Sequence, residues 1–287
     1  MTTRKQDLLC LALYHLGFSR IRNFTLIRRG RPVLRVLTFH DVPSESLSNF
    51  RRQIEYLKKA TNIVSLSDFF AGRLSSTKIN IALTFDDGYQ SWVDGVAPIL
   101  KELSVSATFF VSSGFLRRSA TEEQAGNEST TLDNSTSPMM LTKDGVRDLA
   151  NQGFCIGGHT SNHVDLSAIK DPMCIRAEIK EDKVALESIA GVRVEYFAYP
   201  FGFHENRSVD LPKLLRESGY RAALTLVPGF VTPMSNVYFM RRDLVNPAMP
   251  IPIFKARVFG NYDGVVFLRR LISKPAFQPH STASSSN

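Results

Sequence analysis

Short apolar stretches, rich in β-branched and aromatic residues, recur along the chain and are typical of buried β-strands. The segments with this character are 33–39, 79–85, 107–111, 154–157, 194–198, 221–226 and 237–240. Their apolar residues are mostly consecutive and do not alternate with polar ones, which is the pattern of parallel strands covered on both faces.

Between these stretches, apolar residues recur every three or four positions, the spacing of an amphipathic helix. The helical pattern covers roughly 47–57, 92–103, 141–149 and 175–189. Thr142 is expected to cap the third helix and Gly153 to follow its end. Strands that alternate with helices predict parallel βα units, and hence an α/β fold.

The remaining segments divide the chain. Residues 117–138 are polar, with almost no large apolar side chain, and predict an inserted loop within a main domain at 33–272. The Ser-rich end, 273–287, predicts a disordered tail. Residues 1–32 form a separate basic amphipathic segment.

The N-terminal segment allows two interpretations. Its apolar run, 8–18, is shorter than the ~20 residues that span a bilayer and lacks a signal-peptide cleavage site. Arginines follow directly, at Arg20, Arg22, Arg28, Arg29, Arg31 and Arg35. The run either packs on the core or lies on an anionic membrane. The poor secretion signal predicts a cytoplasmic protein, and the second interpretation would hold it peripherally at the inner face of a membrane.

Composition excludes several classes of protein. The 287 residues, 43% hydrophobic and 22% charged, describe an ordinary globular chain. The net charge of +8 favours anionic partners, but no nucleic-acid-binding motif accompanies it, so no nucleic acid is expected. The three cysteines are too few and too scattered for a disulfide framework.

Four of the predicted strands end in polar residues and a turn. The polar ends carry His40 and Asp41, Asp86 and Asp87, His159 and His163, and Pro200 to Gly202. In a parallel α/β barrel the carboxyl ends of all strands open on one face, where active sites are built. We therefore expect these side chains to meet in one pocket.

Asp86 and Asp87 are adjacent, and Gly88 permits a tight turn that lets both carboxylates face the same pocket. Two neighbouring carboxylates repel each other unless a cation or a proton separates their roles. One could then ligate a metal while the other stays free as a general base. The alternative is that Asp-Asp-Gly is only a turn and a helix cap.

His159 and His163 are four residues apart, so a helical turn would bring both imidazoles to one side. Imidazole is a favoured ligand of first-row metals. Two histidines and one aspartate leave coordination positions open for water and substrate, as a catalytic metal requires. Two surface histidines are the alternative.

Together these residues resemble the polysaccharide deacetylases of the NodB-homology type (carbohydrate esterase family 4). Residues 84–88, TFDDG, are similar to the first motif of that family, and 159–163, HTSNH, to its second, H-[ST]-x-x-H. Residues 199–202, YPFG, resemble the end of its third motif, R-x-P-[YF]-G. The resemblance covers about 79–242 and implies a distorted (β/α) barrel, often with seven strands.

The resemblance also implies roles. Asp86 would be the general base, and Asp87, His159 and His163 would hold a divalent metal ion, zinc or another first-row transition metal. The backbone N–H of Phe201 would help to hold the oxyanion. The implied activity is hydrolysis of a linear amide: removal of N-acetyl groups, or less readily O-acyl groups, from an N-acetylated polysaccharide, oligosaccharide or lipid-linked glycan.

Two positions depart from the family. Ala198 stands where the third motif has arginine; Arg242 could supply that guanidinium or be a surface residue. The late histidine that acts as general acid is not evident after residue 243. His40, oriented by Asp41, is the candidate in its place, as in the branch that acts on poly-N-acetylglucosamine; a structural histidine is the alternative and His204 a weaker candidate. These departures keep a second function open, that of a catalytically silent carbohydrate- or metal-binding relative.

Overall fold

The computed structural model describes residues 10–17, 32–116, 139–202 and 209–263. The predicted inserted loop at 117–138 and the predicted tail at 273–287 lie outside the described residues, as does most of the N-terminal segment.

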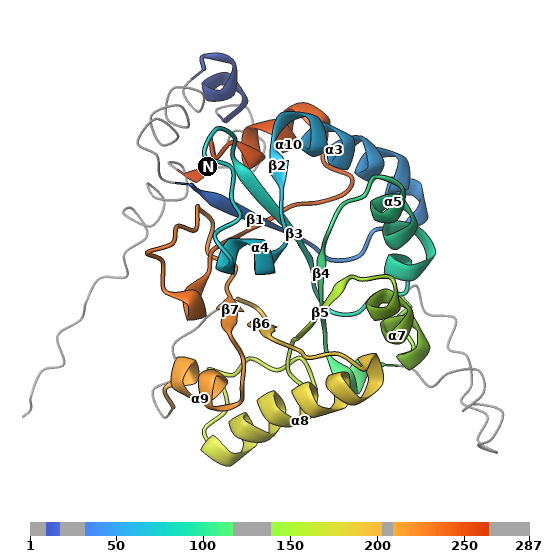
Figure 1. Cartoon of the computed structure of the whole chain (residues 1–287), viewed down its shortest axis with the longest axis vertical. Helices are drawn as coiled ribbons and strands as arrows, with labels where there is room; N and C mark the ends of the chain where they lie inside the picture. The colour runs from blue at the N-terminus through green and yellow to red at the C-terminus, as the bar shows by residue number, and fades with distance from the viewer. Residues whose placement is uncertain (1–9, 18–31, 117–138, 203–208, 264–287) are drawn as a thin grey trace, which may run out of the picture.

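The strands form one sheet in the order β7-β6-β5-β4-β3-β1-β8. The short β2 lies outside this order and pairs with the first two residues of β3. Their bounds are β1 (Leu34–Phe39), β2 (Asn62–Ile63), β3 (Asn80–Phe85), β4 (Thr108–Val111), β5 (Cys155–Gly158), β6 (Tyr196–Ala198), β7 (Ala222–Leu224) and β8 (Arg242–Leu244). All of the ladders are parallel. The N–H of Met240, just before β8, donates to Ala223 O in β7, so the sheet curls into a nearly closed barrel (Figure 1). The structure confirms the predicted seven-stranded barrel.

Helices surround this barrel (Figure 1). They are α3 (Leu47–Ala60), α5 (Ala97–Glu102), α7 (Lys143–Asn151), α8 (Pro172–Ala190), α9 (Leu211–Glu217) and α10 (Ile251–Val258). The short α4 (Leu66–Phe70) lies instead against the end of the barrel where the strands begin. There the ring of Phe70 stacks on Tyr196, the first residue of β6, with 5.8 Å between ring centroids.

Alternation along the strands decides what lies inside the barrel. Leu34 and Val36 face an interior apolar cluster, whereas Leu37 and Phe39 face the layer under the helices. The same alternation turns Thr38 inward, and its register partner in β3 is Thr84. These two threonines are buried and joined by a hydrogen bond of 2.6 Å, so they supply polar groups to an otherwise apolar interior.

One predicted strand is wrong. Residues 237–240 form a 3₁₀ turn, η4 (Val237–Phe239), and β8 begins only at Arg242. The Asn236 side chain caps this turn by accepting the N–H of Tyr238, a local bond that competes with strand pairing. The predicted caps of α7 are confirmed: the Thr142 side chain accepts the N–H of Gly145, and Gly153 follows with φ of +87°.

The described part of the N-terminal segment packs on the domain. Residues 10–15 are helical, and Cys10 is fully buried against Ala256 of α10 and Tyr262. Tyr14 stacks on Phe259 with ring centroids 6.3 Å apart. For these residues the core-packing interpretation applies.

Among the helices that the structure describes, none combines the length and the apolar character that crossing a bilayer would require.

Candidate active site

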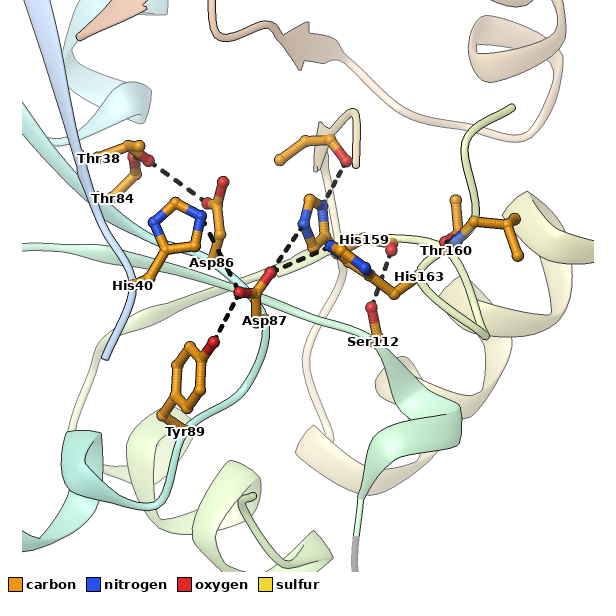
Figure 2. Close-up of polar contacts among 12 residues, drawn as sticks. Thr38, His40, Thr84, Asp86, Asp87, Tyr89, Ser112, His159, Thr160 and His163 are labelled. Atoms are coloured by element: carbon orange, nitrogen blue, oxygen red, sulfur yellow. Dashed lines mark hydrogen bonds and ion pairs between the residues drawn. The ribbon is translucent and has the colours of Figure 1, made fainter. Parts of the chain in front are cut away.

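The predicted polar residues meet at the carboxyl end of the barrel. His40 follows β1, Asp86 and Asp87 follow β3, and His159 follows β5. Figure 2 shows His40 and Tyr89 on one side of the Asp87 carboxylate and the two histidines of the second motif on the other. The side chains at the ends of these parallel strands therefore meet in one place, as expected from the sequence.

The two oxygens of Asp87 have different neighbours. Oδ1 lies 3.4 Å from Nε2 of His159 and 3.2 Å from Nε2 of His163. Oδ2 accepts a hydrogen bond of 3.0 Å from the Tyr89 hydroxyl and lies 3.9 Å from Nε2 of His40. Asp87 has a positive φ of +89°, a conformation that side chains rarely adopt, and it marks the tight turn expected at Asp-Asp-Gly.

The histidine pair is positioned by backbone groups. Nδ1 of His159 lies 2.7 Å from the carbonyl oxygen of Ala198, so Nδ1 carries a proton and Nε2 is the ring nitrogen that faces Asp87. Ser112 donates a hydrogen bond of 2.9 Å to the His159 carbonyl. Thr160 and His163 both have positive φ, so the residues between the imidazoles form a tight turn and not the helical turn that we expected from their spacing.

These three residues fit a divalent metal ion. Their ligand atoms all lie within 4.8 Å of one another. Oδ1 of Asp87 is buried and accepts no hydrogen bond, although two imidazole nitrogens are close to it. Burial alone would raise the pKa of Asp87, but His159 and His163 outweigh burial and lower the pKa far below its usual range. An ionised carboxylate oxygen and two imidazole nitrogens this close together are the donor set of a transition-metal site.

Asp86 is held by Arg242. The side chains of both residues are almost fully buried, and the two terminal guanidinium nitrogens donate to the two carboxylate oxygens, each over 2.7 Å. Arg242 is itself fixed by Nε, which donates to the carbonyl oxygen of Thr225 over 2.9 Å. Burial would raise the pKa of Asp86, but the guanidinium lowers it below its ordinary value. Arg242 is therefore not a surface residue.

His40 faces the pocket without the expected support from Asp41. Its side chain is about one-third exposed, at 35%. Asp41 instead accepts a hydrogen bond of 2.7 Å from Ser91. The backbone of His40 is held from another side, because the indole N–H of Trp92 donates to its carbonyl oxygen over 3.0 Å. The weaker candidate, His204, lies outside the described residues.

Phe201 lies at the rim of the pocket. It has a left-handed φ of +60°, and its ring centroid is 4.7 Å from that of His163. Within the described ranges, its backbone N–H donates to no protein acceptor.

Sequence reasoning missed two residues that support the site. Tyr89 directly follows the first motif and binds Asp87, as described above. Asp182 of α8 is buried, and its carboxylate accepts the N–H of His159 over 2.9 Å and the N–H of Ser113 over 2.8 Å. Burial raises the pKa of Asp182 to about 6. Its position on the apolar stripe of α8, between Ile179 and Leu186, was the signal that could have revealed it.

Residues 74–223 match the model of the polysaccharide deacetylase family, and the chain belongs to this family. YxkH of Bacillus subtilis (strain 168), named as a polysaccharide deacetylase, is 23% identical over 178 residues, which are 62% of this chain and 56% of YxkH. The chain thus spans just over half the length of that relative.

Two further comparisons agree. The poly-β-1,6-N-acetyl-D-glucosamine N-deacetylase of Staphylococcus aureus (strain MRSA252) is 24% identical over 214 residues, which are 71% of this chain and 68% of that protein. The structure of IcaB from Ammonifex degensii superposes with a TM-score of 0.63 at 24% identity, and the match covers 80% of this chain and 97% of that one. The latter likeness shows that the fold is shared.

Proposed function

We propose that this chain is a metal-dependent hydrolase that removes N-acetyl groups from an amino-sugar-containing polysaccharide, oligosaccharide or lipid-linked glycan, with 33–272 as its catalytic domain. The observation that carries the proposal is the pairing of two differently held carboxylates in one pocket. Asp86 is kept ionised by Arg242, and Asp87 faces two histidines. One carboxylate is suited to proton transfer and the other to metal binding. The family to which the chain belongs supports the same reaction.

The metal site would consist of Asp87, His159 and His163. A divalent ion held there, zinc or another first-row transition metal, would act as a Lewis acid toward the acyl carbonyl and the attacking water. The protein's own part is to keep Nε2 of His159 free for the ion, which the bond from its Nδ1 to Ala198 ensures.

Two side chains near this site would carry out the proton transfers, one as a base and the other as an acid. Asp86 accepts a proton from the water whose oxygen attacks the acyl carbon. His40, on the other side of Asp87 from the histidine pair, donates a proton to the nitrogen as the C–N bond breaks, which yields acetate and a free amine. The N–H of Phe201 would stabilise the negative charge that develops on the acyl oxygen.

The second candidate, a silent relative that only binds metal or carbohydrate, rests on the arginine missing at position 198. Arg242 supports the enzyme over this candidate, because it brings a guanidinium to Asp86 from β8. For the substrate, the name of the Staphylococcus aureus relative supports N-acetylglucosamine polymers. Contact with an anionic membrane stays a prediction that the basic charge of the chain supports, and a cytoplasmic location stays a prediction as well.

The test is acetate release from N-acetylglucosamine oligomers by zinc-loaded protein. Asp86→Asn is the test variant, and Asp144→Asn on the surface of α7 is the matched control. We expect release that a chelator abolishes, a loss of about 10²–10⁴-fold in Asp86→Asn with zinc still bound, and normal release from the control. Stoichiometric zinc binding without release from any acylated glycan would instead establish the silent relative.

A further inference from the structure

Two exposed aromatic rings lie against one of the candidate metal ligands. Phe115 and Phe201 are the only phenylalanines among the large apolar side chains that are exposed in the described part of the chain, with 40% and 58% of their surface accessible. Their ring centroids lie 5.9 Å and 4.7 Å from that of His163. Phe115 belongs to none of the motifs that carry the family resemblance, and the hydrolytic chemistry described above makes no use of it.

The position of Phe115 is set by the backbone around it. It ends a short 3₁₀ turn, η3 (Ser113–Phe115), directly after β4. The N–H of Gly114 donates to the carbonyl oxygen of Ser161 over 2.8 Å. A Cβ atom at Gly114 would lie 2.6 Å from that oxygen, so this close approach tolerates no side chain. Phe115 is therefore held against the turn that carries His163.

The turn that carries Phe115 and the candidate metal site are held by the same buried residue, Asp182. The carboxylate of Asp182 accepts the N–H of Ser113, at the start of η3, and the N–H of His159. The buried carboxylate of Asp182 thus holds the backbone of both η3, which carries Phe115, and His159. The exposed ring of Phe115 is held in place at the pocket rim, because the backbone just before it is fixed at Ser113 and at Gly114.

An apolar ring exposed at the mouth of a polar site is typical of a ligand-binding groove. In a gluco-configured pyranose the hydroxyl and acetamido groups are equatorial, so both faces of the sugar present C–H groups. Such a face laid on a phenylalanine ring removes apolar surface of both partners from water, while the polar groups at the sugar's edge stay solvated. A sugar with an axial hydroxyl would lose this contact only on the face that carries the hydroxyl.

We propose that Phe115 binds a gluco-configured pyranose unit of the glycan, next to the unit that is deacetylated, and that Phe201 extends this surface on the other side of His163. The inference rests on the proposed function for the identity of the glycan. Phe115 touches no reacting atom in this arrangement, so it would determine specificity and binding and not the chemical step.

The experiment measures binding and turnover of N-acetylglucosamine oligomers by zinc-loaded protein. The variants are Phe115→Ala, the conservative Phe115→Tyr, and Met173→Ala, which trims an exposed apolar side chain on α8, as the control. We expect Phe115→Ala to raise the Kd and KM by about 3- to 10-fold, with kcat and zinc affinity unchanged. Phe115→Tyr and Met173→Ala should behave like the wild type.

The outcomes separate this inference from the proposed function. If the wild type releases acetate but Phe115→Ala binds the oligomer equally well, the stacking role is wrong and the deacetylase stands. If Phe115→Ala weakens binding of the oligomer but no acetate is released by the wild type, the stacking role holds and the proposed activity fails. Tighter wild-type binding of N-acetylgalactosamine oligomers, or no binding of either series, would overturn the inference.

Discussion

The guanidinium of Arg242 contacts both oxygens of the Asp86 carboxylate through hydrogen bonds of 2.7 Å, although the two residues are 156 positions apart in the chain. Arg242 comes from β8, whose neighbour β1 carries Thr38, and the Thr38 hydroxyl accepts a further hydrogen bond of 2.8 Å from the same guanidinium. The third motif of the family has an arginine at the position of Ala198, at the end of β6. In this chain the guanidinium comes instead from Arg242, at the start of β8. This pair is the basis of the first prediction.

Replacing Arg242 by alanine should impair both stability and turnover. Asp86 would then be a buried charge without its partner, a change that costs about 3–5 kcal/mol of unfolding free energy. Arg242→Lys should recover part of this loss, because an ammonium keeps the charge but not the two parallel hydrogen bonds. Denaturant unfolding and acetate release measure the two effects. Arg241→Ala is the control, because Arg241 is exposed and bonds only to the carbonyl of Pro228 in the described structure. Equal stability of all three variants would contradict the role of the pair.

His40→Gln should slow the release of acetate from amides by about 10²–10⁴-fold, since the departing amine needs a proton. An aryl acetate, whose leaving group departs as a stable anion, should be hydrolysed almost as fast as by the wild type. Comparing kcat for the two substrates, with zinc affinity as the control, tests this role. A loss of the same size on both substrates would mean that His40 serves the structure and not the leaving group.

Tyr89→Phe should weaken zinc binding by about 10- to 100-fold, the range found when a group that supports a metal ligand is removed. The Tyr89 hydroxyl holds Oδ2 of Asp87, and without it the carboxylate can rotate Oδ1 away from the histidines. Competition with a chelating dye gives the zinc affinity. Tyr238→Phe removes a hydroxyl that bonds to the carbonyl of Tyr220, away from Asp87, and should bind zinc normally. Unchanged zinc affinity in Tyr89→Phe would refute the prediction.

The contribution of Asp243 should lower the unfolding free energy of the protein as the pH rises from about 4 to about 6. Burial raises the pKa of this carboxyl from its ordinary 3.8 to about 6, despite Arg35 nearby. Over this window the unfolded chain has released the proton that the folded chain still holds, so the unfolding free energy falls as pH rises. Urea denaturation at pH 4, 5, 6 and 7 should show this fall, and Asp243→Asn should flatten it. Identical pH profiles for the wild type and the variant would contradict the assignment.

Local patterns in the sequence identify most of the strands and the residues at their ends, because alternation and helical spacing are set by neighbours along the chain. They failed at 237–240, where the capping of a turn by Asn236 outweighs strand propensity. Sequence reasoning also did not find Asp182: its place on an apolar helix stripe marks it as unusual, but only the tertiary structure shows that its carboxylate binds the N–H of His159.

The sequence by itself determined the α/β alternation and the family, and it predicted Asp86, Asp87, His159 and His163 as site residues, because each strand pattern and each motif is formed by residues close together in the chain. Only the tertiary structure decided that Arg242 bonds Asp86, that Tyr89 bonds Oδ2 of Asp87, and that Phe115 lies beside His163. Each of these contacts depends on the direction of a side chain. That direction is set by positive backbone φ angles, strand register and barrel closure, which bring together strands distant in sequence.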